Sequence, residues 1–126
     1  MNNTNTRTVE GTWQNANKNT QIIIYRGRKN TKYKRYDEDT SKYYGRVLSS
    51  KNSLTPNQKI LINFKAVGLD YLRDGQALHY PNNKMYEAYI RLMPNGTLKI
   101  RKYIQKTIIG HTDIWTRVMK KEGKSK

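Results

Sequence analysis

The stretch 86–103, YEAYIRLMPNGTLKIRKY, constrains the fold most, because its pattern predicts a β-hairpin. Apolar and polar residues alternate on both sides of the central PNG, as they do in strands with one buried face. A two-residue loop, NG, would pair Leu92 with Lys99 and mix the two faces. A three-residue loop, PNG, pairs Leu92 with Leu98, and proline and glycine suit its first and last positions. We therefore predict the three-residue loop, with one apolar face and one face of tyrosine and cationic side chains.

The remaining chain predicts further short strands and almost no helix. We expect these strands to begin at Gly11 and to occupy Thr20–Arg26, Ser41–Leu48, Lys59–Lys65, Gln76–Tyr80 and His111–Val118. Residues 67–75 should form a turn-containing connection, and the sequence TPNQ at 55–58 predicts at most one short helical turn. Such a pattern in 126 residues indicates one all-β domain, a sandwich or an eight-stranded antiparallel up-and-down barrel. We place this domain at 9–119, between a polar tail (1–8) and a basic tail (120–126).

The net charge of +16 favours polyanionic partners. Six of the ten residues from 26 to 35 are basic: Arg26, Arg28, Lys29, Lys32, Lys34 and Arg35. Tyr33 lies among them in the sequence, and Tyr36 follows directly. This segment makes a basic nucleic-acid-binding barrel one alternative function, and a cationic protein that contacts the cell envelope or acidic glycans another. A solubilising surface explains the same charge without a partner. The acidic run at 37–39, DED, is interpreted as solvated charge.

Catalytic patterns are missing from the sequence. Without cysteine there is no disulfide framework, thiol nucleophile or cysteine zinc site. His79 and His111 are the only histidines, and neither lies in a nucleophile–base or metal-ligand pattern, so we interpret both as surface residues. We expect no enzyme activity, no cofactor and no metal. No apolar run approaches the roughly 20 residues that span a bilayer.

Motifs at the two ends of the chain resemble those of lipocalins and their calycin relatives. Gly11-Thr12-Trp13 is similar to the Gly-x-Trp that opens such barrels, and Arg117 to the last-strand arginine that packs over this tryptophan. A guanidinium over an indole face is a cation–π pair, worth up to about 2 kcal/mol when desolvated. The resemblance implies an eight-stranded lipocalin-like barrel in which Trp13, Trp115 and Arg117 form a structural closure.

The middle of the chain resembles one bacterial family more closely: small secreted or periplasmic single-domain proteins of uncharacterised function. The matching segments are YGRV at 44–47, the stretch from Gly75 to Tyr86, LKIRKY at 98–103 and the closing Gly110. The chain departs from the family pattern at HYP (79–81), at Asn83 and at Lys102. The resemblance implies a secreted or periplasmic location, which requires that a signal peptide has been removed; residues 1–8 contain no such signal, and a cytoplasmic location is the alternative.

Calycin barrels are usually hollow, so the resemblance implies binding, transport or sequestration of a small hydrophobic or amphipathic ligand. The strong positive charge favours a ligand with an acidic group, which Arg101 or Arg46 could pair. The proposed ligand-binding residues are Tyr25, Tyr44, Phe64, Tyr86, Ile90, Ile100, Tyr103 and Arg101. Tyr43 and Tyr44 face opposite ways, so only one of them can point inward. The alternative is that the apolar face of the hairpin is simply core.

Overall fold

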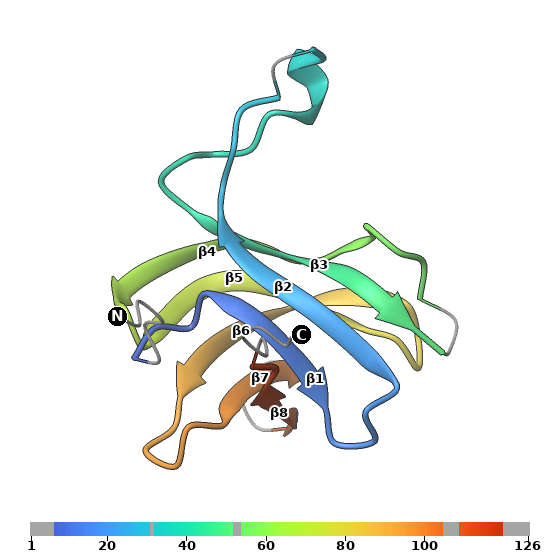
Figure 1. Cartoon of the computed structure of the whole chain (residues 1–126), viewed down its shortest axis with the longest axis vertical. Helices are drawn as coiled ribbons and strands as arrows, with labels where there is room; N and C mark the ends of the chain where they lie inside the picture. Colours follow the sequence, from blue (N-terminus) through green and yellow to red (C-terminus); the bar gives the residue numbers. More distant parts are fainter. Residues whose placement is uncertain (1–6, 31, 52–53, 105–108, 120–126) are drawn as a thin grey trace, which may run out of the picture.

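The computed structural model describes residues 7–30, 32–51, 54–104 and 109–119. Most of the expected tails, residues 1–6 and 120–126, therefore lies outside the described residues. The strands are β1 (Gly11–Asn15), β2 (Thr20–Arg26), β3 (Tyr43–Ser50), β4 (Lys59–Gly68), β5 (Tyr71–His79), β6 (Lys84–Leu92), β7 (Leu98–Ile104) and β8 (Ile109–Arg117). Each strand is antiparallel to the next, and together they form a closed barrel in sequence order (Figure 1). The predicted up-and-down barrel is confirmed.

The barrel closes where the first strand meets the last. β1 pairs with β8 over a short stretch, with Trp13 opposite Arg117 and Asn15 opposite Trp115. We call the end at which Trp13 and Arg117 pair the closed end. The opposite end, at the turns from β1 to β2 and from β5 to β6, is the open end. Because β1 ends at Asn15, the part of β8 nearest the open end has no partner in β1.

The hairpin that anchors the sequence analysis has the predicted register. Leu92 is opposite Leu98 and Tyr89 is opposite Arg101. The N–H of Met93 donates to the carbonyl of Thr97 at 2.8 Å, which leaves a three-residue loop between them. Gly96 in that loop takes a φ of 87°, the left-handed value that the predicted turn requires. Alternation of side chains therefore determined this register correctly.

Strand β5 is longer than the sequence predicts. The expected connection at 67–75 was wrong, because β5 already begins at Tyr71 and runs to His79. Asp74-Gly75 forms a bulge within the strand, with a φ of 61° at Asp74 and a shift in register between Leu72 and Gly75. A Cβ at Gly75 would lie 2.3 Å from the ring of Phe64, so glycine is needed there for packing and does not end the strand.

The expected helical turn at 55–58 is a hydrogen-bonded turn instead. The side chain of Gln58 does return to Thr55, where its Oε1 accepts from the backbone N–H at 3.0 Å. Asn57, however, has a φ of 69°, which no right-handed helix accommodates. The described helical segment is a 3₁₀ turn, η1 (Lys34–Tyr36), on the long connection between β2 and β3. Among the described residues, no helix has the length and apolar character needed to cross a membrane.

The interior of the barrel is packed with side chains. Inward-facing positions of most strands contribute large residues that are almost fully buried, among them Trp13, Ile22, Ile24, Leu61, Phe64, Leu72, Ile90 and Leu98. A barrel of eight strands has an interior that such side chains are able to fill. This core fills the closed end and the middle of the barrel and extends to Leu54 and Trp115 towards the open end, so a ligand site has to be sought at the rim of the open end or on the outer wall.

Candidate functional site at the open end of the barrel

The closed end is held by the arginine and tryptophan that the sequence pairs. The guanidinium carbon of Arg117 lies 4.3 Å from the ring centroid of Trp13. The two terminal nitrogens of Arg117 donate to the carbonyls of Glu10 (3.0 Å) and Thr8 (2.6 Å), and the indole N–H of Trp13 donates to Val9 (2.9 Å). A Cβ at Gly11 would approach the guanidinium to 2.8 Å. These contacts tie both ends of the chain together and leave no room for a ligand between Trp13 and Arg117.

The eight proposed ligand-binding residues do not share one surface. Phe64, Ile90 and Ile100 are buried in the core, and Tyr86 packs against His79 nearer the open end. The remaining four point to the outer wall: Tyr25, Tyr44, Arg101 and Tyr103. Alternation in β7 explains the placement of two of them, because Leu98 and Ile100 face inward and Arg101 and Tyr103 therefore face outward.

Tyr44 is directed away from the core. Its ring stacks on Tyr25 with centroids 6.2 Å apart, and its hydroxyl donates to Asn63 Oδ1 at 2.9 Å. Tyr43 is the one of the pair that packs against the core cluster. Arg46 is also on the outer wall, where its Nε donates to the hydroxyl of Tyr25 at 2.6 Å. Neither Arg46 nor Arg101 therefore faces the barrel interior.

Polar side chains meet on the inner face near the open end. Lys102 is opposite Ala88 and His111, while Asp113 is opposite Ile100, so the register assigns Lys102, His111 and Asp113 to the inward-facing set. The ammonium of Lys102 lies 3.0 Å from one oxygen of Asp113, and His111 Nε2 lies 2.9 Å from the other. We call His79, Tyr86, Lys102, His111 and Asp113 the open-end cluster.

His79 and His111 are neighbours in space although they are 32 positions apart in the chain. Their ring centroids are 5.1 Å apart, and the ring of His79 is 6.0 Å from that of Tyr86. Our interpretation of two separate surface histidines was therefore wrong: His111 is exposed, but His79 is partly buried and packs against His111. Burial lowers the pKa of His79, and the nearby cations Lys102 and His111 add to this effect.

A positive charge is buried in this cluster. Lys102 is only 3% exposed, and its ammonium also donates to the carbonyl of Leu78 at 3.4 Å. A buried ammonium needs a partner, and the partner here, Asp113, is shared with His111. Burial raises the pKa of the Tyr80 hydroxyl close by, with a further contribution from the charge of Asp113.

Two buried polar atoms near the open end have no protein partner. Among the described residues that are not exposed, His79 Nδ1 and Trp115 Nε1 are the buried side-chain nitrogens or oxygens without a hydrogen bond. Trp115 lines a hollow of about 410 Å³ between the β1–β2 turn and β8, together with Tyr80, His111 and Asp113. An unsatisfied buried donor costs about 1–3 kcal/mol, so a hydrogen-bond acceptor that reaches the indole N–H of Trp115 from this hollow would recover that cost.

Sequence reasoning missed this cluster although one signal was present. Lys102 occupies the position in β7 that continues the inward series of Leu98 and Ile100. A charged residue at an inward position indicates either a partner or a site, because a lone buried charge is unstable. The meeting of His79 with His111 depends on the pairing of β5 with β6, β6 with β7 and β7 with β8, which no local pattern reveals.

The chemistry of the open-end cluster suits recognition of an anion. It offers an ammonium, two imidazoles and an indole N–H around a single carboxylate, with tyrosine rings beside them. Among the described histidine, aspartate and glutamate side chains, no group of three is arranged to hold a metal ion.

Comparison with known proteins agrees with the fold. A solved structure described as "Protein HP1028 from the human pathogen Helicobacter pylori belongs to the lipocalin family" superimposes with a TM-score of 0.61. The two chains share 16% sequence identity, and the match covers 88% of this chain and 83% of the other. At that identity the similarity shows a lipocalin-like fold and nothing finer. No curated protein matches the chain.

The family comparison gives the remaining finding. A family model described as "Uncharacterized protein conserved in bacteria (DUF2147)" matches residues 11–117, which include all eight strands of the barrel. This chain is therefore a member of that bacterial family, with a lipocalin-like barrel as its fold.

Proposed function

We propose that this protein binds a small amphipathic anion at the open end of its barrel, without catalysing a reaction. The acidic group of the ligand contacts Lys102 and the two histidines, and its apolar part lies against Tyr80 and Trp115. The observation that carries the proposal is the pair of unpartnered buried nitrogens: Trp115 Nε1, on a residue that lines the hollow, and His79 Nδ1, whose ring packs against His111 at the edge of the hollow.

Charge and shape support this class of ligand. Within the open-end cluster, the carboxylate of Asp113 is shared between the ammonium of Lys102 and the imidazole of His111, so neither of them has a carboxylate of its own. The hollow of about 410 Å³ lies within the usual range for small-molecule sites, and Ala16, Tyr80 and Trp115 supply apolar surface.

The packed core limits the length of the ligand. Trp13, Phe64 and Ile90 fill the barrel below the open-end cluster, so an apolar chain that follows the barrel axis meets these side chains. We therefore expect a compact ligand, such as an aromatic acid or a medium-chain fatty acid, in place of a long acyl chain. Sequestration or transport outside the cytoplasm would suit such a binder, and this location belongs to the proposal.

The test compares acids with neutral analogues of the same shape. Isothermal titration calorimetry with octanoate and with octanol should show tighter binding of the acid by about tenfold or more, since a hydrogen bond to a charged group contributes about 1.5–3 kcal/mol. The variant Lys102→Met should abolish this preference while leaving the binding of octanol nearly unchanged.

Lys99→Met is the matched control. Lys99 belongs to the same strand but faces outward, with its ammonium 5.6 Å from the ring of Tyr89. The Lys99→Met variant should retain the preference for octanoate over octanol. Equal binding of acid and alcohol by the wild-type protein, or equal loss in both variants, would refute recognition at the open end. Thermal unfolding of each variant verifies that Lys102→Met is folded.

A further inference from the structure

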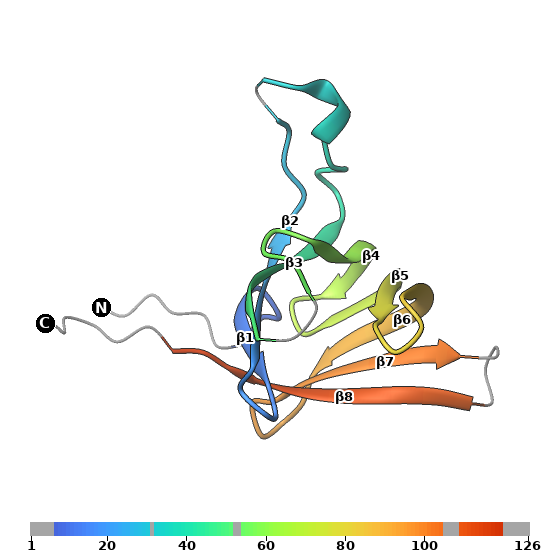
Figure 2. The same cartoon turned by 90° about the vertical axis from the view of Figure 1, so that its right-hand side faces the viewer.

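The long connection between β2 and β3 forms an arm outside the barrel. We define the arm as residues 27–42, of which all but residue 31 are described. It rises well away from the strands in both views (Figures 1 and 2). The arm and its preceding residue carry seven basic and three acidic side chains, so the projection is strongly cationic.

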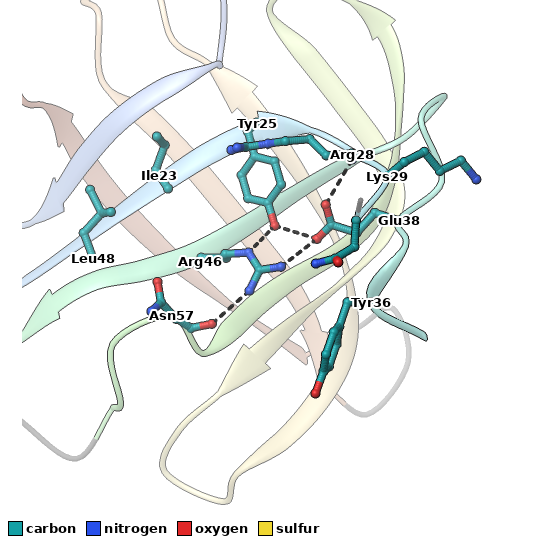
Figure 3. Close-up of a pocket in the computed structure, with 10 residues that line it drawn as sticks. Ile23, Tyr25, Arg28, Lys29, Tyr36, Glu38, Arg46, Leu48 and Asn57 are labelled. Carbon is teal, nitrogen blue, oxygen red and sulfur yellow. Dashed lines mark hydrogen bonds and ion pairs between the residues drawn. The ribbon is translucent and has the colours of Figure 1, made fainter. Parts of the chain in front are cut away.

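Glu38 fixes the base of the arm to the outer wall of the barrel. Its side chain is only 3% exposed, and its carboxylate accepts from the Tyr25 hydroxyl (2.6 Å), Arg46 (3.1 Å) and the backbone N–H of Arg28 (3.1 Å). The ammonium of Lys59 is 2.8 Å away. Figure 3 shows Tyr25, Glu38 and Arg46 converging at the centre of this arrangement. Our interpretation of the acidic run as solvated charge was therefore wrong for Glu38, whose partners keep the arm in a defined position.

The outer part of the arm is ordered by its own polar groups. Asn30 Oδ1 accepts from the backbone N–H groups of Lys32 (2.9 Å) and Tyr33 (2.6 Å), and Asp37 Oδ1 accepts from that of Asn30 (2.7 Å). The bonds to Asn30 precede η1 and the bond to Asp37 joins the residues on its two sides, while all the residues of η1 are exposed. An ordered segment with no buried side chain gains little by packing, so its residue types are free to serve a surface role.

A cleft lies between the arm and the barrel wall. It has a volume of about 530 Å³ and is lined by Ile23, Tyr25, Arg28, Lys29, Asn30, Tyr36, Glu38, Arg46, Leu48 and Asn57 (Figure 3). Cations, tyrosine rings and two aliphatic side chains thus surround one concave space. Arg28 lies over the ring of Tyr25, with 4.6 Å between the guanidinium carbon and the ring centroid.

Exposed tyrosines continue the cleft onto the arm. Tyr33 and Tyr36 are 45% and 51% exposed, and the guanidinium carbon of Arg35 lies 5.3 Å and 4.9 Å from their rings. Proteins that bind single strands combine aromatic faces, on which bases stack, with cations that contact the phosphates. Here each exposed ring has a cation beside it, as that mode of binding requires.

We propose that the arm and this cleft bind single-stranded nucleic acid, with Tyr33 and Tyr36 stacking on bases and Arg28 and Lys29 contacting phosphates. This surface is separate from the open-end cluster and does not depend on the proposed small ligand. The concave cleft favours a flexible strand over a bilayer, whose flat surface reaches only the projecting part of the arm. An acidic glycan would engage the cations without needing the paired tyrosine faces.

The test measures the fluorescence anisotropy of a labelled oligothymidylate of about 20 nucleotides over a range of salt concentrations. The double variant Tyr33→Ala/Tyr36→Ala should weaken binding by roughly fivefold or more for each ring that stacks. The double variant Arg28→Gln/Lys29→Gln should reduce the slope of log affinity against log salt by about 1.4, for two lost phosphate contacts.

Lys65→Gln/Lys84→Gln is the matched control, because it removes the same charge from two exposed lysines outside the arm. It should leave the affinity and the salt slope close to those of the wild type. The proposal is overturned if the tyrosine variant binds the oligonucleotide as tightly as the wild type does. It is also overturned if the same heparin concentration displaces the oligonucleotide from the wild type and from the tyrosine variant. Sedimentation with anionic vesicles but no binding to the oligonucleotide would likewise reject it. Circular dichroism verifies that the variants keep the barrel.

Discussion

Arg117 shows how one side chain closes a barrel. Its guanidinium covers the face of Trp13 and donates to two carbonyls of the segment before β1, so it joins the last strand to the start of the first. The sequence contains both partners of this contact, and the resemblance to lipocalins identifies them as a pair. The indole N–H of Trp13, in turn, bonds to Val9, which extends the closure into the residues before β1.

Arg117→Met should therefore destabilise the fold. Loss of the cation–π contact and of the charged hydrogen bonds predicts a decrease of about 2–3 kcal/mol in the free energy of unfolding, measured by urea denaturation. Arg91→Met is the control, because Arg91 lies 4.0 Å from the ring of Tyr71 but is exposed. That substitution should cost less than about 1 kcal/mol. Equal effects of the two substitutions would show that Arg117 has no special part in closure.

At the scale of the structural element, the arm depends on one buried carboxylate. Although burial alone raises the pKa of Glu38, hydrogen bonds from Lys59, Tyr25 and the backbone of Arg28 lower it below its usual value. A lowered carboxyl pKa means that the folded state favours the ionised form. Its contribution to stability is therefore complete above the ordinary pKa of 4.5 and is lost as the pH falls through the lowered pKa.

Trypsin provides a direct measurement of this attachment, because the arm is rich in lysine and arginine. Glu38→Gln removes the charge that Arg46 and Lys59 contact, so cleavage within 28–42 should become several-fold faster at neutral pH. Asp39→Asn is the control: Asp39 is exposed, and an amide oxygen can still accept from Ser41. Protection of the arm in the wild type against hydrogen exchange, relative to the intrinsic rate at each pH, should also fall below about pH 4.5. Unchanged cleavage in Glu38→Gln would show that Glu38 does not hold the arm to the barrel.

At the scale of the whole molecule, local patterns predicted the barrel better than its sites. Alternation and turn chemistry gave the hairpin register correctly, since Leu92 and Leu98 must both be buried. The bulge at Gly75 was read as a break, because nothing near it in sequence reveals the ring of Phe64. The open-end cluster joins β5, β6, β7 and β8, so its members become neighbours only when the sheet is assembled.

The two tryptophans allow ligand binding at the open end and at the closed end of the barrel to be followed separately. Trp115 lines the open-end hollow with an unpartnered indole N–H, whereas the indole N–H of Trp13 bonds to Val9 at the closed end. A ligand that enters at the open end must therefore change the indole signal of Trp115 and leave that of Trp13 unchanged. The sequence contains no third tryptophan, so the two signals of a ¹H–¹⁵N spectrum report the two ends of the barrel.

Titration with octanoate, followed through these two indole resonances, tests ligand binding at the open end most directly. A saturable shift of the Trp115 signal is expected while the Trp13 signal stays in place, and Lys102→Met should need at least about tenfold more octanoate to give the same shift. A shift confined to Trp13, or no saturable shift of Trp115, would contradict ligand binding at the open end.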